Sequence, residues 1–392
     1  MNKFFLDLGK QPLANNFLSK HDSKQPFYNL KLFFNDSNKL VSISKRIPSK
    51  IMFDNKYPYK SSMSKTMKTS FKRLSKIIKK RFNPNLLLEI GSNDGALLKN
   101  FDKKKVIGVE PCLNLARITQ KKGFKTYSHY WNNKTAKYIN RKHNNIDLIY
   151  SANTLTHISN LNDVFKSITK VLNKNGVLII EDPSLLECLK KNSYDQFYNE
   201  HIYVFSTIAL KNILKKFSLE IFDLENLNTH GGSLRFFIKN IKNKKFKITT
   251  KVKKQIKSEI NYGLQKFKTY KNFATRVKKS KSKLLNILNK LKNMNKTITG
   301  YGATAKAVTV LNYCKIDENL IKCFVDTTPE KQNKYMPGKK IKVLRYVNKN
   351  IKNTDYFFLG AWNFKNEILN KEKKFIKKGG KFLTHIPIPK II

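Results

Sequence analysis

The sequence of 392 residues is long enough for two or three domains. Hydrophobic residues make up 40% and aromatic residues 12% of it, which excludes a mainly disordered chain, and 15 glycines exclude a collagen repeat. Lys and Arg number 79 against 26 Asp and Glu, a net charge of +53. These basic residues are spread over every segment, for example 103–105 and 242–247, whereas nucleic-acid-binding proteins usually gather them in a patch. We therefore expect no nucleic-acid partner.

No run of eighteen apolar residues occurs, so we expect no membrane partner. The apolar stretch within residues 1–9 is too short for a signal peptide, and we expect a cytoplasmic location. The four cysteines form no Cys-x-x-Cys pair, which indicates neither a zinc knuckle nor a disulfide framework.

In chain order, residues 1–64 read as a small irregular N-terminal lobe, because prolines interrupt any long helix. Residues 65–248 begin with a helical stretch and continue as an alternation of helices with short apolar strands. The strands are expected at 85–90, 106–110, 146–150 and 176–181. Apolar strands between helices predict a doubly wound α/β domain with a parallel sheet covered on both faces.

Residues 249–295 have apolar side chains at three- and four-residue steps, which predicts a helical linker, broken once near 279–282. Residues 296–392 return to the alternation, with strands expected at 297–299, 321–325 and 356–359. They predict a smaller, Rossmann-like α/β domain at the C-terminus.

The segment Glu89–Gly95 is a glycine turn between the first strand and a helix expected to begin near Ala96. Such a turn brings backbone N–H groups close to a ligand at the carboxyl end of the strand. Glu110 closes the next strand, where its carboxylate can accept the hydroxyls of a ribose. Asn93 replaces the middle glycine of a dinucleotide motif, which favours S-adenosylmethionine over a dinucleotide. The expected cofactor-binding residues are Glu89, Gly91, Ser92, Asn93, Asp94, Gly95, Glu110, Pro111 and Asn153.

Motifs along almost the whole chain resemble those of one family, the C-methyltransferases that act on nucleotide-linked keto-deoxysugars. They are Asp7–Asn15, Phe53–Ser62, Glu89–Gly95, Gly108–Pro111, Ala152–His157, Asp195–His201, His230–Arg235, Gly300–Lys306, Val325–Gln332, Pro337–Gly338, Ala361–Asn363 and Gly379–Gly380. The resemblance implies a class I S-adenosylmethionine-dependent methyltransferase fold with a C-terminal Rossmann-like domain, and a nucleotide-linked keto-sugar as substrate.

Methylation of carbon requires removal of a hydrogen next to a ketone and stabilisation of the enolate. By the resemblance, His201 is the candidate base, and Glu200 and Tyr198 position and polarise the keto-sugar, with Glu200 as the alternative base. His157 is implied to lie close to the reacting centre. Tyr59, or Tyr57 in its place, is implied to close the site and to donate to the enolate.

The second glycine turn, Gly300–Lys306, also lies between a strand and a helix, and Lys306 suits a phosphate. The resemblance implies that this lobe holds the nucleotide diphosphate of the sugar, with Lys331 as a possible helper. The expected substrate-binding residues are Tyr57, His230, Arg235, Gly302 and Lys306.

Two departures from the family pattern stand out. The family's N-terminal zinc site has two cysteine pairs, but the first pair is absent and Asn35 and Asn38 replace the second. Amide oxygens are poor zinc ligands, so we expect no zinc and a less rigid N-terminal lobe. Asn199 replaces the first histidine of the family signature.

Three other functions stay open at this point. The first is methylation of oxygen or nitrogen in a related small molecule, which would need no base beside a ketone. The second is RNA binding or RNA methylation, suggested by the charge. The third is a scaffold without activity, suggested by the missing cysteines. The sequence leaves the sugar, the methylated carbon, the nucleotide carrier and the oligomeric state open.

Overall fold

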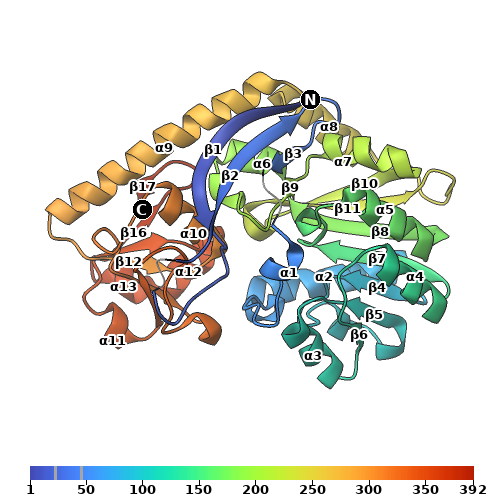
Figure 1. Cartoon of the computed structure of the whole chain (residues 1–392), viewed down its shortest axis with the longest axis horizontal. Coiled ribbons are helices and arrows are strands. Elements are labelled where there is room, and N and C mark those ends of the chain that lie inside the picture. The colour runs from blue at the N-terminus through green and yellow to red at the C-terminus, as the bar shows by residue number, and fades with distance from the viewer. Residues whose placement is uncertain (22–23, 45–46) are drawn as a thin grey trace.

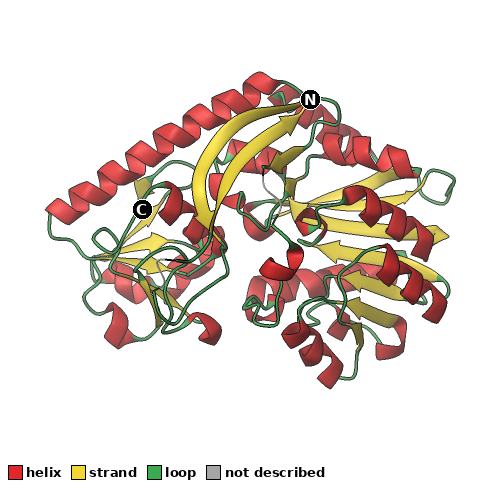
Figure 2. Cartoon of the chain, viewed as in Figure 1, coloured by secondary structure: helices red, strands yellow, loops and turns green. Residues whose placement is uncertain are grey.

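The computed structural model describes residues 1–21, 24–44 and 47–392, whose strands form three β-sheets (Figure 1 and Figure 2). A seven-stranded and a six-stranded sheet lie in two lobes, and a curved hairpin and a long helix run between these lobes (Figure 1). We call them the central lobe and the C-terminal lobe.

The seven-stranded sheet of the central lobe has the order β10–β11–β8–β7–β4–β5–β6, and every neighbouring pair is parallel except those made by β11. Helices alternate with the parallel strands, which confirms the predicted doubly wound sheet. The strands are β4 (Leu87–Ile90), β5 (Val106–Val109), β6 (Lys125–Tyr127), β7 (Ile146–Ala152), β8 (Leu172–Pro183), β10 (Leu219–Leu227) and β11 (Ser233–Asn240). The helices are α2 (Lys65–Arg81), α3 (Leu113–Lys121), α4 (Asn133–Lys142), α5 (Leu161–Val171), α6 (Leu185–Lys190) and α7 (Thr207–Leu214).

Strand β4 shows why its sequence is apolar apart from Glu89. All residues of β4 are buried, and their side chains alternate between the two faces of the sheet. Leu88 and Ile90 join one hydrophobic core, whereas Leu87 joins another. Both faces are therefore covered, as in parallel sheets generally.

The chain after β4 differs from the prediction. Instead of an α-helix from Ala96, residues 93–97 form turns that lead into a short 3-10 helix, η2 (Leu98–Asn100). Asn93 and Gly95 have φ values of 51° and 77°, which a right-handed helix does not allow.

The C-terminal lobe contains the predicted second α/β unit. Its sheet has the order β14–β13–β12–β15–β16–β17, parallel except for the last pair. The strands are β12 (Ile298–Tyr301), β13 (Cys323–Asp326), β14 (Lys342–Arg345), β15 (Tyr356–Leu359), β16 (Lys381–Thr384) and β17 (Lys390–Ile391). The helices are α10 (Ala305–Tyr313), α11 (Asn348–Ile351), α12 (Lys365–Lys371) and α13 (Lys373–Lys377).

The N-terminal segment is more regular than predicted. It forms an antiparallel sheet of β1 (Asn2–Pro12), β2 (Phe27–Asn35), β3 (Val41–Ile43) and β9 (Tyr203–Val204), followed by the short helix α1 (Ser49–Met52). The prolines lie at a strand end or between elements, where they do not interrupt the ladder. Residues 45–46 lie outside the described part of the chain.

The linker between the lobes is helical, as predicted, but its break lies elsewhere. It consists of α8 (Thr250–Tyr262) and the straight 27-residue α9 (Phe267–Asn293). Gly263 ends α8 in the left-handed conformation, and α9 continues without interruption through 279–282. Helix α9 packs on β1, which also contacts α10 of the C-terminal lobe.

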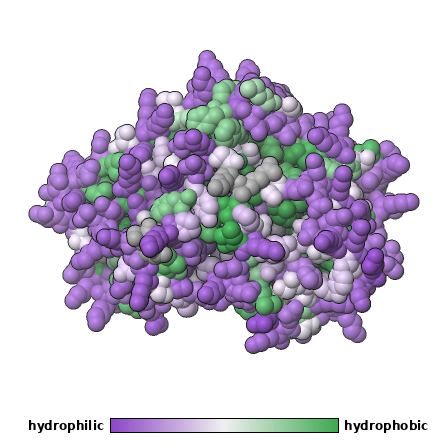
Figure 3. Space-filling model, in the orientation of Figure 1, coloured by the Kyte–Doolittle hydropathy of each residue, from purple (hydrophilic) through white to green (hydrophobic). Residues whose placement is uncertain are grey.

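Hydrophilic side chains cover most of the face in Figure 3, and hydrophobic ones show in smaller patches between them. Among the described residues, no helix is both long and apolar enough to cross a bilayer.

Candidate active site

A cavity of about 760 Å³ lies where the N-terminal segment, the central lobe and the C-terminal lobe meet. It opens at the carboxyl ends of β4 and β12, the position where α/β sheets bind their ligands. Most of the predicted site residues line it: Tyr57, Tyr59, Glu89, Gly91, Ser92, Asn93, Glu110, Pro111, Asn153, His157, Tyr198, His201, His230, Gly302 and Lys306.

The glycine turn after β4 is built to receive a ligand. Gly91 has φ of 75°, and a Cβ atom there would lie 2.1 Å from the hydroxyl oxygen of Thr154. Glu110 accepts hydrogen bonds from the backbone N–H of Asn93 at 2.8 Å and of Cys112 at 2.9 Å. These two bonds fix the carboxylate at the end of β5 with lone pairs remaining for ribose hydroxyls.

Glu89 is the residue that most clearly indicates a polar ligand at the part of the cavity lined by the turn after β4. Its side chain is buried, and its Oε2 atom has no hydrogen-bond partner in the described part of the chain. Burial raises the pKa of Glu89 well above its usual range, and nearby Glu110 raises it further. A buried polar atom without a partner is unfavourable unless a ligand or water satisfies it, so the residues present fit the expected S-adenosylmethionine.

Two predicted cofactor residues lie behind this wall. Asp94 accepts hydrogen bonds from the backbone N–H and the hydroxyl of Ser62, so it anchors the N-terminal segment to the turn. Gly95 has φ of 77° and lies against Thr119. Neither lines the cavity, and both maintain the shape of the turn.

A short strap, residues 60–62, runs over the glycine turn. The backbone N–H of Ser61 donates to Oδ1 of Asn93 at 2.9 Å. Lys60 forms an ion pair with Glu330 of the C-terminal lobe. The strap thereby connects the cofactor wall to the opposite lobe. Tyr59, just before it, lines the cavity, and its carbonyl accepts a hydrogen bond from Nδ2 of Asn93.

His201 is held in one tautomer. Its Nδ1 lies 2.8 Å from the carbonyl oxygen of Gln196, and because a carbonyl only accepts, Nδ1 carries the hydrogen. Nε2 is then the acceptor for the hydroxyl of Tyr198 at 2.6 Å. Burial keeps the pKa of His201 well below its usual value, so the ring is neutral, and burial raises the pKa of Tyr198, which stays a phenol.

Glu200 lies one layer behind the cavity surface. Its Oε1 accepts from Nδ2 of Asn15 at 2.7 Å, and its Oε2 accepts from the hydroxyl of Tyr57 at 2.9 Å. Burial raises its pKa to about 7. Asn199, the departure from the signature, donates to the carbonyls of Gln11 and Pro12 and so attaches this segment to β1.

Two further histidines face the cavity as neutral rings. His157 is stacked between Phe53 and His201, with ring centroids 5.3 and 5.1 Å away, and burial lowers its pKa to about 3. His230 has φ of 53°, and its Nε2 lies 3.4 Å from Nδ2 of Asn153. Burial lowers its pKa to about 3 as well.

The C-terminal lobe repeats the arrangement of the central lobe. Gly302, with φ of 85°, follows β12, and Asp326 ends β13. Asp326 accepts from the backbone N–H of Ala303 and of Thr328, both at 2.8 Å. In the central lobe, Glu110 in the same way accepts a hydrogen bond from a backbone N–H group of the turn after β4. Asp326 lines the cavity and is absent from the predicted site, although its place at the end of a second strand carries the same signal as Glu110.

Two lysines of this lobe differ in role. Lys306 lines the cavity with 8% of its surface exposed, and burial lowers its pKa. Lys331 donates to the carbonyl of Ala303 at 2.8 Å, so it also supports the glycine turn.

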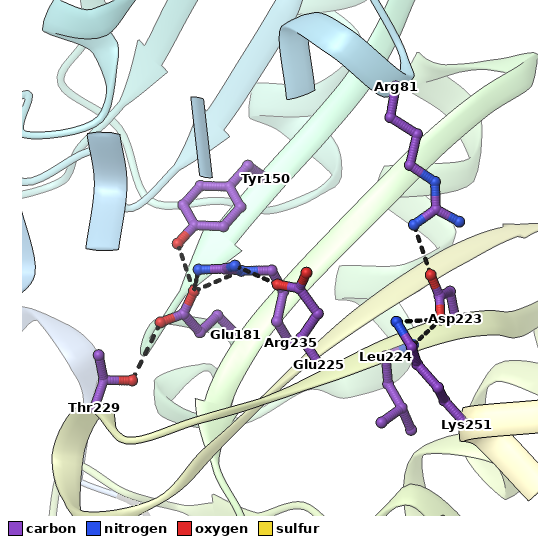
Figure 4. A network of polar contacts seen from close by, with 9 residues as sticks. All are labelled: Arg81, Tyr150, Glu181, Asp223, Leu224, Glu225, Thr229, Arg235 and Lys251. Atoms are coloured by element: carbon purple, nitrogen blue, oxygen red, sulfur yellow. Dashed lines mark hydrogen bonds and ion pairs between the residues drawn. The ribbon is translucent and has the colours of Figure 1, made fainter. Parts of the chain in front are cut away.

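Arg235 does not lie at the cavity, which corrects its predicted place in substrate binding. Its guanidinium is 1% exposed and forms ion pairs with Glu181 at 2.8 Å and Glu225 at 2.7 Å (Figure 4). Tyr150 and Thr229 also donate to Glu181. These contacts lie on the central sheet, where Arg235 of β11 faces its neighbouring strands, so its role is structural.

The asparagines at the zinc-cysteine positions hold a turn with their side chains. Oδ1 of Asn35 accepts from the backbone N–H of Ser37 and of Asn38, both at 3.0 Å, and Oδ1 of Asn38 accepts from that of Leu40. Within the described ranges, no group of three or more His, Cys, Asp or Glu side chains is placed to hold a metal ion.

The strand order with an antiparallel β11, together with the acid-clamped glycine turn after β4, defines an S-adenosylmethionine-dependent methyltransferase. A methyltransferase-domain family model matches residues 59–224, and a model described as the C-methyltransferase C-terminal domain matches residues 228–387. The chain thus contains a methyltransferase domain followed by a C-methyltransferase C-terminal domain, and it is an S-adenosylmethionine-dependent C-methyltransferase.

The chain is 27% identical to C-methyltransferase NovU of Streptomyces niveus over 99% of this chain and 93% of that protein. Similar solved structures include an S-adenosylmethionine-dependent methyltransferase from Clostridium acetobutylicum, 15% identical, covering 46% of this chain and 93% of that one with a TM-score of 0.34. Another is magnesium protoporphyrin IX methyltransferase from Synechocystis, 10% identical, covering 44% and 79% with a TM-score of 0.33.

Proposed function

We propose that this enzyme methylates a carbon next to the ketone of a nucleotide-linked keto-deoxysugar. The observation that carries the proposal is the shared cavity. One wall has the Glu110 turn, another has the Tyr198–His201 pair, and a third has Asp326 and Lys306. A substrate with a sugar at one end and a nucleotide at the other fits this division, and the resemblance to sugar C-methyltransferases supports it.

On the cofactor side, Glu110 accepts the ribose hydroxyls, and Gly91 gives the turn its left-handed conformation and leaves room for Thr154 behind it. The carboxyl group of Glu89 provides a further polar partner through its Oε2 atom. The bound cofactor supplies an electrophilic methyl group.

On the substrate side, the hydrogen next to the ketone is removed by the Tyr198–His201 pair. The proton passes to the oxygen of Tyr198 while the hydroxyl proton of Tyr198 passes to Nε2 of His201, and the C–H electron pair becomes the enolate. His201 becomes a cation whose Nδ1–H stays on the Gln196 carbonyl. The enolate carbon is the nucleophile for the methyl group.

The C-terminal lobe holds the nucleotide. Asp326, clamped as Glu110 is, accepts the hydroxyl of the carrier's sugar, and Lys306 binds the diphosphate. Tyr57 is engaged with Glu200, which makes it a support for the acid and leaves Tyr59 as the donor toward the enolate oxygen.

The proposal is tested with a panel of nucleotide-linked keto-deoxysugars in D₂O containing S-adenosylhomocysteine. The expected result is deuterium at the carbon next to the ketone, and carbon methylation once S-adenosylmethionine is added. Methylation at oxygen or nitrogen without deuterium exchange would overturn the proposal.

A further inference from the structure

The segment that carries the base is attached to the C-terminal lobe through one buried carboxylate. Asp195 lies in η5 (Tyr194–Gln196), three residues before Tyr198, with 0% of its surface exposed. Its Oδ2 accepts from Nε1 of Trp362 at 2.6 Å and from Nε2 of His385 at 2.9 Å. Trp362 follows β15 and His385 follows β16, so both donors come from the C-terminal lobe.

Trp362 also contacts the loop that contains His230 and Gly231. A Cβ atom on Gly231 would lie 2.3 Å from the indole carbon Cη2 of Trp362, so glycine is needed for the two segments to meet. Gly231 follows His230, and the carbonyl of His230 accepts from the side-chain amide of Gln196. One indole therefore contacts the segment that leads to His201 and the loop that carries His230.

The contact reaches the imidazole of His201 in two steps. Gln196 follows Asp195 in the chain, and the carbonyl of Gln196 is the acceptor for Nδ1–H of His201. A shift of Asp195 moves this carbonyl and with it the direction of Nε2. Asp195 also lies close enough to Lys306, which is on the same lobe as Trp362, for its negative charge to raise the pKa of Lys306 and favour the charged lysine.

The energetics argue against a role in stability alone. Burying a carboxylate costs free energy that two hydrogen bonds only partly offset, and an apolar side chain of similar size often stabilises as well or better. Oδ1 of Asp195 and Nδ1 of His385 have no partner among the described residues, which adds to that cost. Hydrogen bonds are directional, however, and an apolar contact would not fix the orientation of the segment.

We propose that Asp195, held by Trp362 and His385, is a positioning residue that fixes the Tyr198–His201 pair relative to the nucleotide-holding lobe. The inference rests on the proposed function, because it assigns the C-terminal lobe to the nucleotide. Its consequence is that the base stays aligned with a sugar whose carrier is bound by another lobe.

The test uses full-length variants assayed for kcat, for KM of the keto-sugar and for the Kd of S-adenosylmethionine. Trp362→Phe keeps the ring beside Gly231 but removes the donor, and Asp195→Leu removes the acceptor. Both should lower kcat about 100-fold, the cost of a small misplacement, with KM and Kd within about twofold of wild type. Asp195→Asn retains an oxygen for both donors and should recover activity to within about tenfold.

Tyr270→Phe is the matched control, because the Tyr270 hydroxyl donates to the Leu264 carbonyl at 2.7 Å in a buried site on α9. It should lower the melting temperature as much as Trp362→Phe does and leave kcat unchanged. Deuterium exchange should fall in parallel with kcat in Trp362→Phe. Full kcat in Trp362→Phe, or no recovery in Asp195→Asn, would overturn the positioning role.

A fluorine label on the two tryptophans separates this inference from the proposed function. Trp131 lines the cavity and Trp362 does not. Thymidine or uridine diphosphate should shift the Trp362 resonance of wild-type protein, and S-adenosylhomocysteine should shift that of Trp131. If nucleotide shifts neither signal and no nucleotide sugar is turned over, both proposals fall. If wild type binds nucleotide and is active while Trp362→Phe matches it, only the positioning role falls.

Discussion

The hydroxyl of Tyr198 lies 2.6 Å from Nε2 of His201, and the centroids of their rings are 4.0 Å apart. This contact means that the imidazole does not face the cavity as a free base. Its accepting nitrogen is reached through the phenol, so in the proposed reaction the two side chains act as one acceptor for the substrate's proton.

Tyr198→Phe should keep the packing of the pair and remove the path for the proton. We expect kcat to fall by about 10²–10⁴, the usual contribution of a positioned acid–base group, with cofactor affinity unchanged. His201→Ala should behave in the same way. The measurements are methyl transfer from labelled donor and calorimetry with S-adenosylmethionine.

Tyr270→Phe is the control for this change too, because the Tyr270 hydroxyl donates to the Leu264 carbonyl at 2.7 Å and neither residue lines the cavity. Its kcat should equal that of wild type. An active Tyr198→Phe enzyme would remove the phenol from the reaction.

Glu110→Gln and Asp326→Asn should have separate effects. In each variant an amide NH₂ group, which donates, replaces one oxygen of a carboxylate that accepts two backbone N–H bonds. Glu110→Gln should weaken S-adenosylmethionine binding roughly 10–100-fold, the value of a hydrogen bond to a charged group, and leave nucleotide binding intact. Asp326→Asn should do the reverse. Calorimetry with both ligands on both variants checks this, and equal losses for both ligands would contradict two distinct sites.

Glu200 should make stability fall as pH rises. Burial raises its pKa from 4.5 to about 7, so between these values the folded chain retains a proton that the unfolded chain releases. Its contribution is therefore complete below pH 4.5 and lost as pH rises through 7. Relative to Glu200→Gln, which does not titrate, the free energy of unfolding of wild type should drop by about 3 kcal/mol between pH 4 and 8. Urea unfolding of both proteins measures it, and a constant difference would mean that Glu200 titrates normally.

Arg235→Met should destabilise the fold without affecting ligands. It leaves Glu181 buried, and the partly exposed Glu225, without their cation, so we expect a loss of about 3–5 kcal/mol in the free energy of unfolding. Lys3→Met breaks the Lys3–Asp36 pair, whose side chains are 39% and 41% exposed, and should cost less than about 1 kcal/mol. A raised KM for the sugar in folded Arg235→Met would return this residue to the substrate site.

The sequence predicted the features that depend on local pattern. Apolar strands such as β4, followed by a glycine turn and an acid one strand later, indicated the central sheet, which was found as expected. The same pattern marks Asp326, so that residue was predictable too.

Features that depend on distant partners were not predictable. Nothing local to Arg235 distinguishes a buried ion pair with Glu181 from a ligand contact, and nothing local to Asp195 indicates Trp362, 167 residues away. The N-terminal strands were missed because lysines and prolines weaken their pattern, which only pairing across β1 and β2 makes regular.

Two stretches of chain, the β1–β2 hairpin and α9, cross from one lobe to the other and lie against each other (Figure 1). A single connecting segment would allow the two lobes to rotate relative to each other, whereas two segments that pack against each other resist this rotation. Under the proposed function, the distance between the bound methyl donor and the nucleotide carrier is then fixed before the substrate binds, so little of its binding free energy is spent on bringing the lobes together. A substrate with a shorter or longer link between its sugar and its nucleotide should then bind well and react slowly.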